Sequence, residues 1–200
     1  MLDKSIPYKN LIMRADIFSP AFFCALPAGF SIKTYEPGDE VHWAAIETSV
    51  GEFDSESEAL DYFKETYLPT IDELRRRCFF AVSPDGAFVG TITAWYEKND
   101  AGETGIVHWF GVRPEYQRMG LGTALLGIMM AFFQAQAAFP VYLHTQTWSH
   151  DAIRLYVKTG FCLLKSGSFQ GNPNDYPEAM QILSSVVPSQ TLEAWINAAQ

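Results

Sequence analysis

The segment VRPEYQRMGLGTALL, residues 112–126, constrains the fold more than any other part of the sequence. A β-rich run, GIVHWFGV, precedes it, and a long apolar run follows it. Gly120 and Gly122 therefore lie where a strand ends and a helix begins, and the first backbone N–H groups of a helix have no acceptor within it. Such a helix start binds phosphate, and glycine lets the phosphate approach the backbone. The segment predicts a phosphate-binding turn.

Two widespread phosphate-binding loops do not fit this segment. A Walker A loop requires a lysine directly after its last glycine, and this chain has Thr123 there. A dinucleotide-binding turn requires a third small residue, where this chain has Leu125, and an acid about 20 residues further on, where residues 138–147 contain none. The sequence therefore argues against both nucleotide-binding classes.

The remaining pattern predicts one α/β domain with a mixed, largely antiparallel sheet flanked by helices. Its expected order of strands and helices is β-α-α-β-β-β-α-β-α-β-β, and Pro84-Asp85-Gly86 predicts a hairpin turn. The last two strands are expected at residues 162–169 and 178–186. We expect an irregular N-terminal extension at 1–30 with a strand-like piece at 8–13, a main domain at 31–187 and a C-terminal helix at 188–200.

Charge and cysteine content narrow the classes of ligand and location. The net charge is −9, and residues 39–73 hold eleven acids against Lys64 alone. So acidic a region repels nucleic acid and attracts a cationic small molecule, although a solvated helical face explains the acids equally well. Three widely spaced cysteines without metal-ligand spacing predict a reduced, cytoplasmic setting and no metal site. The sequence has two long apolar stretches, at residues 15–30 and 121–138. Prolines interrupt the first and polar residues the second, so we expect no membrane segment.

Two sequence patterns carry a family resemblance. Gln117, Gly120 and Gly122 form Q-x-x-G-x-G, and residues 149–161 match N-x-x-A-I-x-L-Y-x-K-x-G-F except that Ser149 replaces the asparagine. In this order, and separated by one helix and one strand, they resemble the GNAT superfamily of N-acetyltransferases over residues 31–187. Ser149 loses the family's asparagine contact to the cofactor but is able to cap the following helix.

The resemblance implies acetyl-coenzyme A as the cofactor. The backbone of Phe110 and Val112 would pair with the pantetheine arm, and the N–H groups of the turn would hold the diphosphate. Arg118 would add positive charge. The implied cofactor-binding residues are Phe110, Val112, Gln117, Arg118, Met119, Gly120, Leu121, Gly122, Thr123 and Ser149.

The implied reaction is direct acyl transfer from the thioester to a primary amine, which requires a base for the amine and an acid for the departing thiolate. Tyr156 stands at the family's acid position, although a helical tyrosine also serves packing. His108 is the first candidate for the base and His144 the reserve, with Glu47 or Glu52 acting through water as an alternative. A histidine hydrogen-bonded within a sheet is the structural alternative for His108.

The acceptor is expected to be a small, cationic amine, because aromatic faces and carboxylates together bind such groups. The residues predicted to contact it are Trp43, Glu47, Glu52, Phe53, Trp109 and His144. His42 and His150 look like surface or helix-start residues, and a homodimer is possible for such a family. Two alternatives stay open: a non-catalytic acyl-coenzyme A sensor, and a protein or peptide N-acetyltransferase.

Overall fold

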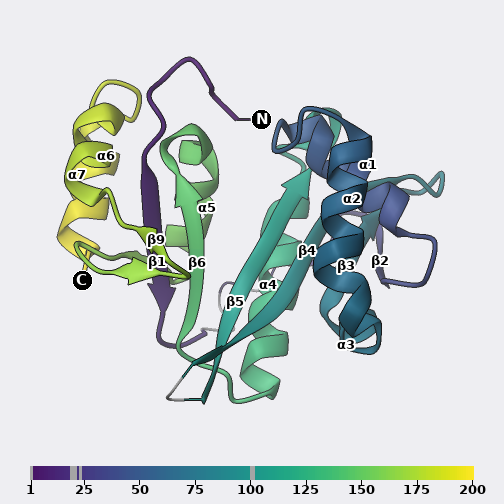
Figure 1. Cartoon of the computed structure of the whole chain (residues 1–200). Coiled ribbons are helices and arrows are strands. Elements are labelled where there is room, and N and C mark those ends of the chain that lie inside the picture. The colour runs from purple at the N-terminus through teal and green to yellow at the C-terminus, as the bar shows by residue number, and fades with distance from the viewer. Residues whose placement is uncertain (1, 19–21, 23, 100–101) are drawn as a thin grey trace. The chain divides into compact units, whose positions relative to one another are not determined.

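The computed structural model describes residues 2–18, 22, 24–99 and 102–200. Seven strands follow the order β2-β3-β4-β5-β6-β1-β7, and β8 pairs with β9 (Figure 1). This is an α/β fold with a mixed sheet flanked by helices, as the sequence predicts. The chain divides into a first compact unit, Phe23–Trp95 with Val107–Phe132, and a second, Leu2–Phe22 with Tyr96–Ile106 and Phe133–Gln200.

The first unit carries strands that pair in sequence. β2 (Ser31–Thr34) pairs antiparallel with β3 (Cys78–Val82), and β3 pairs antiparallel with β4 (Phe88–Asn99). The predicted hairpin turn joins β3 to β4: Gly86 has a left-handed φ of 87° and donates its N–H to the Ser83 carbonyl at 2.9 Å. The unit also contains α1 (Glu40–Val50), α2 (Glu56–Tyr67), η2 (Leu68–Thr70), α3 (Ile71–Arg77) and η3 (Pro114–Tyr116). It includes β5 (Gly102–Val112) from Val107 onward and α4 (Leu121–Ala135) up to Phe132.

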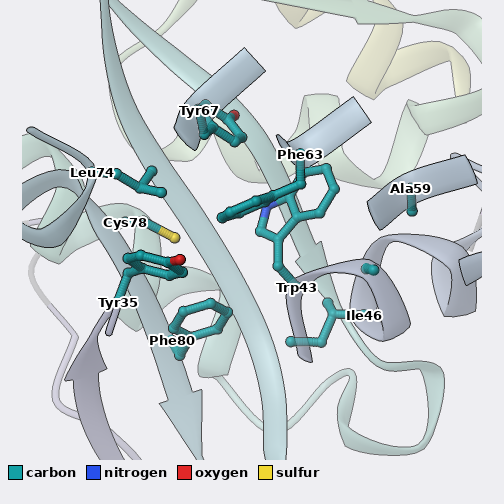
Figure 2. Close-up of a cluster of buried hydrophobic side chains, with 10 residues drawn as sticks. Tyr35, Trp43, Ile46, Ala59, Phe63, Tyr67, Leu74, Cys78 and Phe80 are labelled. Atoms are coloured by element: carbon teal, nitrogen blue, oxygen red, sulfur yellow. The ribbon is translucent and has the colours of Figure 1, made fainter. Parts of the chain in front are cut away.

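The surroundings of two strand glycines show that α1 and α4 cover opposite faces of the sheet. A Cβ added at Gly111 of β5 would meet Ile46 and Glu47 of α1, whereas one added at Gly90 of β4 would meet Leu125 of α4. The face toward α1 and α2 forms an aromatic cluster (Figure 2), which consists of Tyr35, Trp43, Ala44, Ile46, Ala59, Phe63, Tyr67, Leu74, Cys78 and Phe80. Every member of this aromatic cluster is at most 1% exposed, so the cluster holds the helices firmly against the strands.

The second unit is built around β1 (Asn10–Ala15). This strand pairs antiparallel with β6 (Val141–Gln146) on one side and with β7 (Cys162–Leu163) on the other. Buried and half-buried residues alternate along β6, as in a strand with one apolar face. The other elements are η4 (Thr147–Ser149), α5 (His150–Lys158), β8 (Ser168–Phe169), β9 (Asn172–Pro173), α6 (Tyr176–Leu183) and α7 (Ser189–Ala198).

The sequence-based assignment is wrong near the C-terminus of the main domain. Residues 178–186, predicted as a strand, lie mainly in the helix α6, because Pro177 suits a first helical turn and Ala179, Met180 and Leu183 form one buried face. The predicted strand at 162–169 is interrupted, since Gly167 adopts a left-handed φ of 105° between β7 and β8.

The two ends of the chain fit the prediction better. The predicted C-terminal helix is present as α7, and β1 overlaps the strand-like piece expected at residues 8–13. Residues 1, 19–21 and 23 of the predicted extension lie outside the described residues. Within the described part of the chain, no helix has the length and apolar character needed to cross a bilayer.

Candidate functional site

The turn between β5 and α4 is held to the end of β5 by a side chain. The Gln117 amide Nε2 donates to the Val112 carbonyl at 2.8 Å. The backbone N–H of Arg113 donates to the Val89 carbonyl of β4, also at 2.8 Å, and the Arg113 Nε donates to Phe88 at 3.0 Å. The turn therefore leaves the strand in a fixed direction, with Gln117 committed to shaping it.

The segment after Gln117 has the backbone geometry of an anion site. Arg118 and Gly120 both adopt left-handed φ angles, 63° and 91°, and a Cβ added at Gly120 would meet nothing within 4 Å. The first helical hydrogen bond of α4 runs from the Ala124 N–H to the Gly120 carbonyl at 3.0 Å. The N–H groups of residues 121–123 consequently have no intrahelical acceptor, and they lie at the positive end of a 15-residue helix. Alternating backbone handedness of this kind creates concavities lined by N–H groups.

The side chains of this turn leave its backbone accessible. Arg118 is exposed, Met119 is 47% exposed, and Gly122 and Thr123 are half-buried. Leu121, in contrast, points into the core and is 1% exposed, so it anchors the start of the helix. The predicted cofactor residues of this segment thus share one turn, in which Arg118 supplies the positive side chain.

The strand β5 is locally distorted where the acyl group is expected. Trp109 has a left-handed φ of 48°, a conformation that costs a bulky residue of order 1–3 kcal/mol. Its indole Nε1 donates to the Tyr62 hydroxyl at 3.0 Å, and its ring lies 4.9 Å from that of Phe53. Surrounding contacts therefore hold a strained backbone between His108 and Phe110. Strain of this kind is common at functional sites.

His108 lies next to the distortion and is neutral at physiological pH. Its Nδ1 is 2.7 Å from the Tyr67 hydroxyl, and its ring also lies against Trp95, with centroids 6.3 Å apart. Burial of the imidazole lowers its pKa to about 4, even though part of the side chain reaches the surface. A neutral imidazole accepts a proton through one nitrogen, which is the state required of a base.

Glu47 is enclosed in the first unit beside β5. The residue is 0% exposed, neither carboxyl oxygen has a hydrogen-bond partner among the described residues, and Oε1 is 3.0 Å from the Cβ position of Gly111. Burial, and secondarily the charge of the half-buried Glu52, raises the pKa of Glu47 well above its usual value. Burial therefore favours the neutral carboxylic acid form of Glu47 over the anion.

The predicted acceptor residues of the first unit lie together, but they differ in accessibility. Trp43 is 0% exposed and contacts Phe53 and Trp109, both with ring centroids 5.8 Å away. Phe53, Trp109 and Glu52 are half-buried. Trp43 consequently fills the core, while Phe53 and Trp109 present the aromatic surface that a ligand is able to reach.

The remaining predicted residues belong to the second unit. Tyr156 on α5 is 7% exposed and packs edge-on against Phe161, with ring centroids 6.0 Å apart. Ser149 precedes α5 but makes no side-chain capping hydrogen bond, so the capping role predicted for it is wrong. His144 on β6 is half-buried, and its Nε2 lies 3.0 Å from Oδ1 of Asn10 on β1.

These observations can be compared with known proteins. The model of the Acetyltransferase (GNAT) family matches residues 40–161. The chain belongs to this family. The matched segment contains every residue proposed above for cofactor, catalysis or acceptor, from Trp43 to Tyr156.

Individual GNAT relatives are distant. Mycothiol acetyltransferase of Acidothermus cellulolyticus is 28% identical over 173 residues, which cover 76% of this chain and 50% of the relative. The Streptomyces griseus protein of the same name is 30% identical over 68% of this chain and 44% of its own length. The chain thus spans about half the length of the curated relatives it matches.

A solved structure supports the fold. A GCN5-related N-acetyltransferase from Sphaerobacter thermophilus has a TM-score of 0.61 and 22% identity, covering 79% of this chain and 49% of that one. At this identity the likeness concerns the arrangement of strands and helices.

Sequence reasoning missed two tyrosines that touch predicted site residues. Tyr67 bonds to His108 and Tyr62 accepts from Trp109, across 41 and 47 positions of sequence. In the sequence, Tyr67 follows Phe63 at helical spacing, which is typical of a core position, and no spacing signal links it to His108. The left-handed conformation of Trp109 also has no signature in the sequence, since tryptophan rarely adopts it.

Proposed function

We propose that this chain transfers the acetyl group of acetyl-coenzyme A to the primary amine of a small, cationic acceptor. The single observation that carries the proposal is the turn at residues 117–123. There, two left-handed residues and the unpaired N–H groups at the start of α4 form an anion site directly after β5. Membership of the GNAT family supports acetyl-coenzyme A as the acetyl donor, and its diphosphate would be the anion that this turn binds.

The cofactor is proposed to bind along β5 and the turn. The N–H groups of residues 118–123 would hold the diphosphate, with Arg118 adding charge-assisted hydrogen bonds. The backbone of Phe110 and Val112 would face the pantetheine arm, and Ser149 would replace the family's asparagine near that arm. Gln117 contributes indirectly, since its amide is bonded to Val112 and fixes the turn.

The proposed chemistry needs little activation, because a thioester is already an electrophile. A free alkyl ammonium has a pKa of about 10 and is not a nucleophile while it is protonated. Water therefore removes its first proton before the amine attacks. As the nitrogen bonds to the acyl carbon, its remaining N–H becomes much more acidic, and neutral His108 takes that proton on Nε2. The C–S bond breaks as the carbonyl reforms, and the Tyr156 hydroxyl protonates the leaving thiolate.

The acceptor site is proposed to lie at Phe53 and Trp109, whose rings are half-buried. An ammonium group is attracted to such aromatic faces and to the neighbouring Glu52, and its arrival favours ionisation of Glu47. His144 remains the reserve contact. Relatives named mycothiol acetyltransferase support a small-molecule acceptor rather than a protein. A cytoplasmic location and a homodimer stay predictions.

The proposal is tested by supplying acetyl-coenzyme A with a panel of primary amines, including diamines, amino sugars and peptides with a free N-terminus. Release of coenzyme A thiol and the acetylated product are followed together, the product by mass spectrometry. We expect product with small cationic amines, and a slower release in Tyr156→Phe with unchanged cofactor affinity. Tight cofactor binding without any product identifies a sensor, and product from peptides alone identifies a peptide transferase; either outcome contradicts the proposal.

A further inference from the structure

Tyr67 is the polar group that contacts the proposed base, and no role has been assigned to it so far. It is the last residue of α2 and 0% exposed. Aromatic rings enclose it. The rings of Phe63 and Trp43 lie with centroids 5.0 Å and 6.0 Å away (Figure 2), and that of Trp95 lies 5.0 Å away. Such packing fixes the position of the phenol oxygen, which lies 2.7 Å from Nδ1 of His108.

We propose that Tyr67 is a positioning residue that accepts a hydrogen bond from the Nδ1–H of His108 and so keeps the Nε2 lone pair available for the acceptor's proton. The inference rests on the proposed function, in which His108 is the base. It adds a residue outside both sequence motifs, on a helix that carries no other part of the proposed chemistry.

The direction of this hydrogen bond decides whether His108 is able to act. A neutral imidazole carries one N–H, and a phenol both donates and accepts. If Tyr67 donated to Nδ1, the imidazole proton would sit on Nε2 and His108 could not take a proton there. If Nδ1–H donates to Tyr67, Nε2 is free to accept.

A second hydroxyl provides the acceptor that the phenol proton needs in this arrangement. Once Tyr67 accepts from His108, its own proton needs another acceptor. The Thr93 hydroxyl on β4 is buried and has no partner of good geometry among the described residues, yet it lies close enough to the phenol to lower its pKa. In the order His108 to Tyr67 to Thr93 the imidazole N–H and the phenol O–H each have an acceptor, and this is the order that leaves Nε2 of His108 free. The reverse order joins the same three groups and places the imidazole proton on Nε2, so the tautomer of His108 distinguishes the two.

The surroundings keep Tyr67 neutral while the proton is transferred. Burial is the largest cause that raises the pKa of Tyr67, followed by Tyr62 on α2, Cys78 on β3 and Glu47 on α1. In the transfer step an N–H bond of the acceptor amine breaks and an Nε2–H bond forms on His108. The resulting imidazolium donates through Nδ1 to the neutral phenol, and its extra proton later leaves to water. Tyr67 thus stabilises the charged base without itself exchanging a proton.

The test compares Tyr67→Phe with Tyr35→Phe. Tyr35 is also a fully buried phenol of the aromatic cluster, and it donates to Glu40 rather than to His108. Nitrogen NMR of labelled histidine reads the His108 tautomer in each protein, and thermal unfolding confirms that each is folded. We expect Nδ1–H in the wild type and in Tyr35→Phe, and a mixed or Nε2–H population in Tyr67→Phe. For acetyl transfer we expect kcat to fall roughly tenfold or more in Tyr67→Phe, with KM unchanged.

Two results would overturn the inference. The first is an Nε2–H tautomer in the wild-type protein, a measurement that needs no variant to fold. The second is a Tyr67→Phe protein with wild-type kcat, pH profile and tautomer. If the wild type acetylates no amine at all, the proposed function fails instead, and the tautomer measurement still decides whether Tyr67 orients His108.

Discussion

The surroundings of His108 in the first unit contrast with those of His144 in the second. His108 faces the Tyr67 phenol, which both donates and accepts, and aromatic rings bury it. His144 faces Oδ1 of Asn10, which accepts only and already receives the Tyr8 hydroxyl at 2.6 Å. The Nε2 of His144 must therefore carry a hydrogen, while the tautomer of His108 is set by Tyr67.

The two histidine contacts differ in what surrounds them. Asn10 lies on β1, whose pairing with β6 holds the second unit together, so the His144 bond belongs to that pairing. Around His108, the Glu47 carboxyl and the Trp43 indole N–H are buried without hydrogen-bond partners in the described chain. Unpaired buried polar atoms cost stability, and in native proteins a catalytic role or a bound water or ion accounts for such atoms.

The largest difference between the His108 and His144 regions is expected in kcat. His108→Gln should lower kcat for acetyl transfer by roughly 100-fold or more, because a general base contributes about 10²–10⁴. The matched variant His144→Gln should change kcat by no more than about threefold, since its Nε2–H has a structural partner. Steady-state kinetics with the best amine measure both, and a larger loss in His144→Gln would exchange the two roles.

The next effect concerns stability against pH. The folded-state pKa of His108, about 4, lies below the ordinary 6.5, so the unfolded chain takes up the proton first as pH falls. Stability should decrease between pH 6.5 and pH 4 by about 2–3 kcal/mol more in the wild type than in His108→Gln. Urea unfolding at several pH values measures the difference. Burial also lowers the pKa of His144, but by less than that of His108. His144→Gln should therefore remove a smaller part of the pH dependence of stability, with the same sign. Parallel curves for wild type and His108→Gln would contradict the burial of His108.

A smaller, opposite change in stability is expected at Glu47. Glu47→Leu should stabilise the fold by about 1–3 kcal/mol, since it removes a buried carboxyl that has no partner. The pKa of Glu47 is raised in the folded state, so wild-type stability is lost as pH rises above 4.5 and the gain of the variant grows with pH. Glu65→Leu, on an exposed part of α2, is the control and should stay within about 0.5 kcal/mol. Destabilisation by Glu47→Leu would show that the carboxyl has a partner in solution.

The smallest effect is expected in the second unit. Asn10→Leu removes the acceptor shared by Tyr8 and His144, and should destabilise the fold by about 1 kcal/mol. Asn10→Asp keeps an acceptor in the same place and should recover most of this loss. Chemical denaturation at pH 7 measures both variants. Equal losses in the two variants would mean that strand packing, rather than the shared hydrogen bond, sets the effect.

The sequence predicted the fold through local signals and missed what depends on distant contacts. The turn at residues 117–123 and the hairpin at Gly86 have short signatures, and both form where predicted. The strand predicted at 178–186 failed because its apolar residues also suit one helical face, and only packing distinguishes the two. The bond from Tyr67 to His108 and the enclosure of Glu47 join separate elements, so no spacing rule anticipates them.

The measurement that tests the central claim most directly is the affinity of the protein for coenzyme A, dephospho-coenzyme A and pantetheine, by calorimetry at one ionic strength. If the turn at residues 117–123 holds the diphosphate, the first two should bind with affinities within about tenfold of each other. Pantetheine, which lacks the diphosphate and the adenosine attached to it, should then bind at least roughly 100-fold more weakly, because two charge-assisted hydrogen bonds to the diphosphate alone account for about that factor. Equal affinity for pantetheine, or no affinity for coenzyme A, would contradict the account.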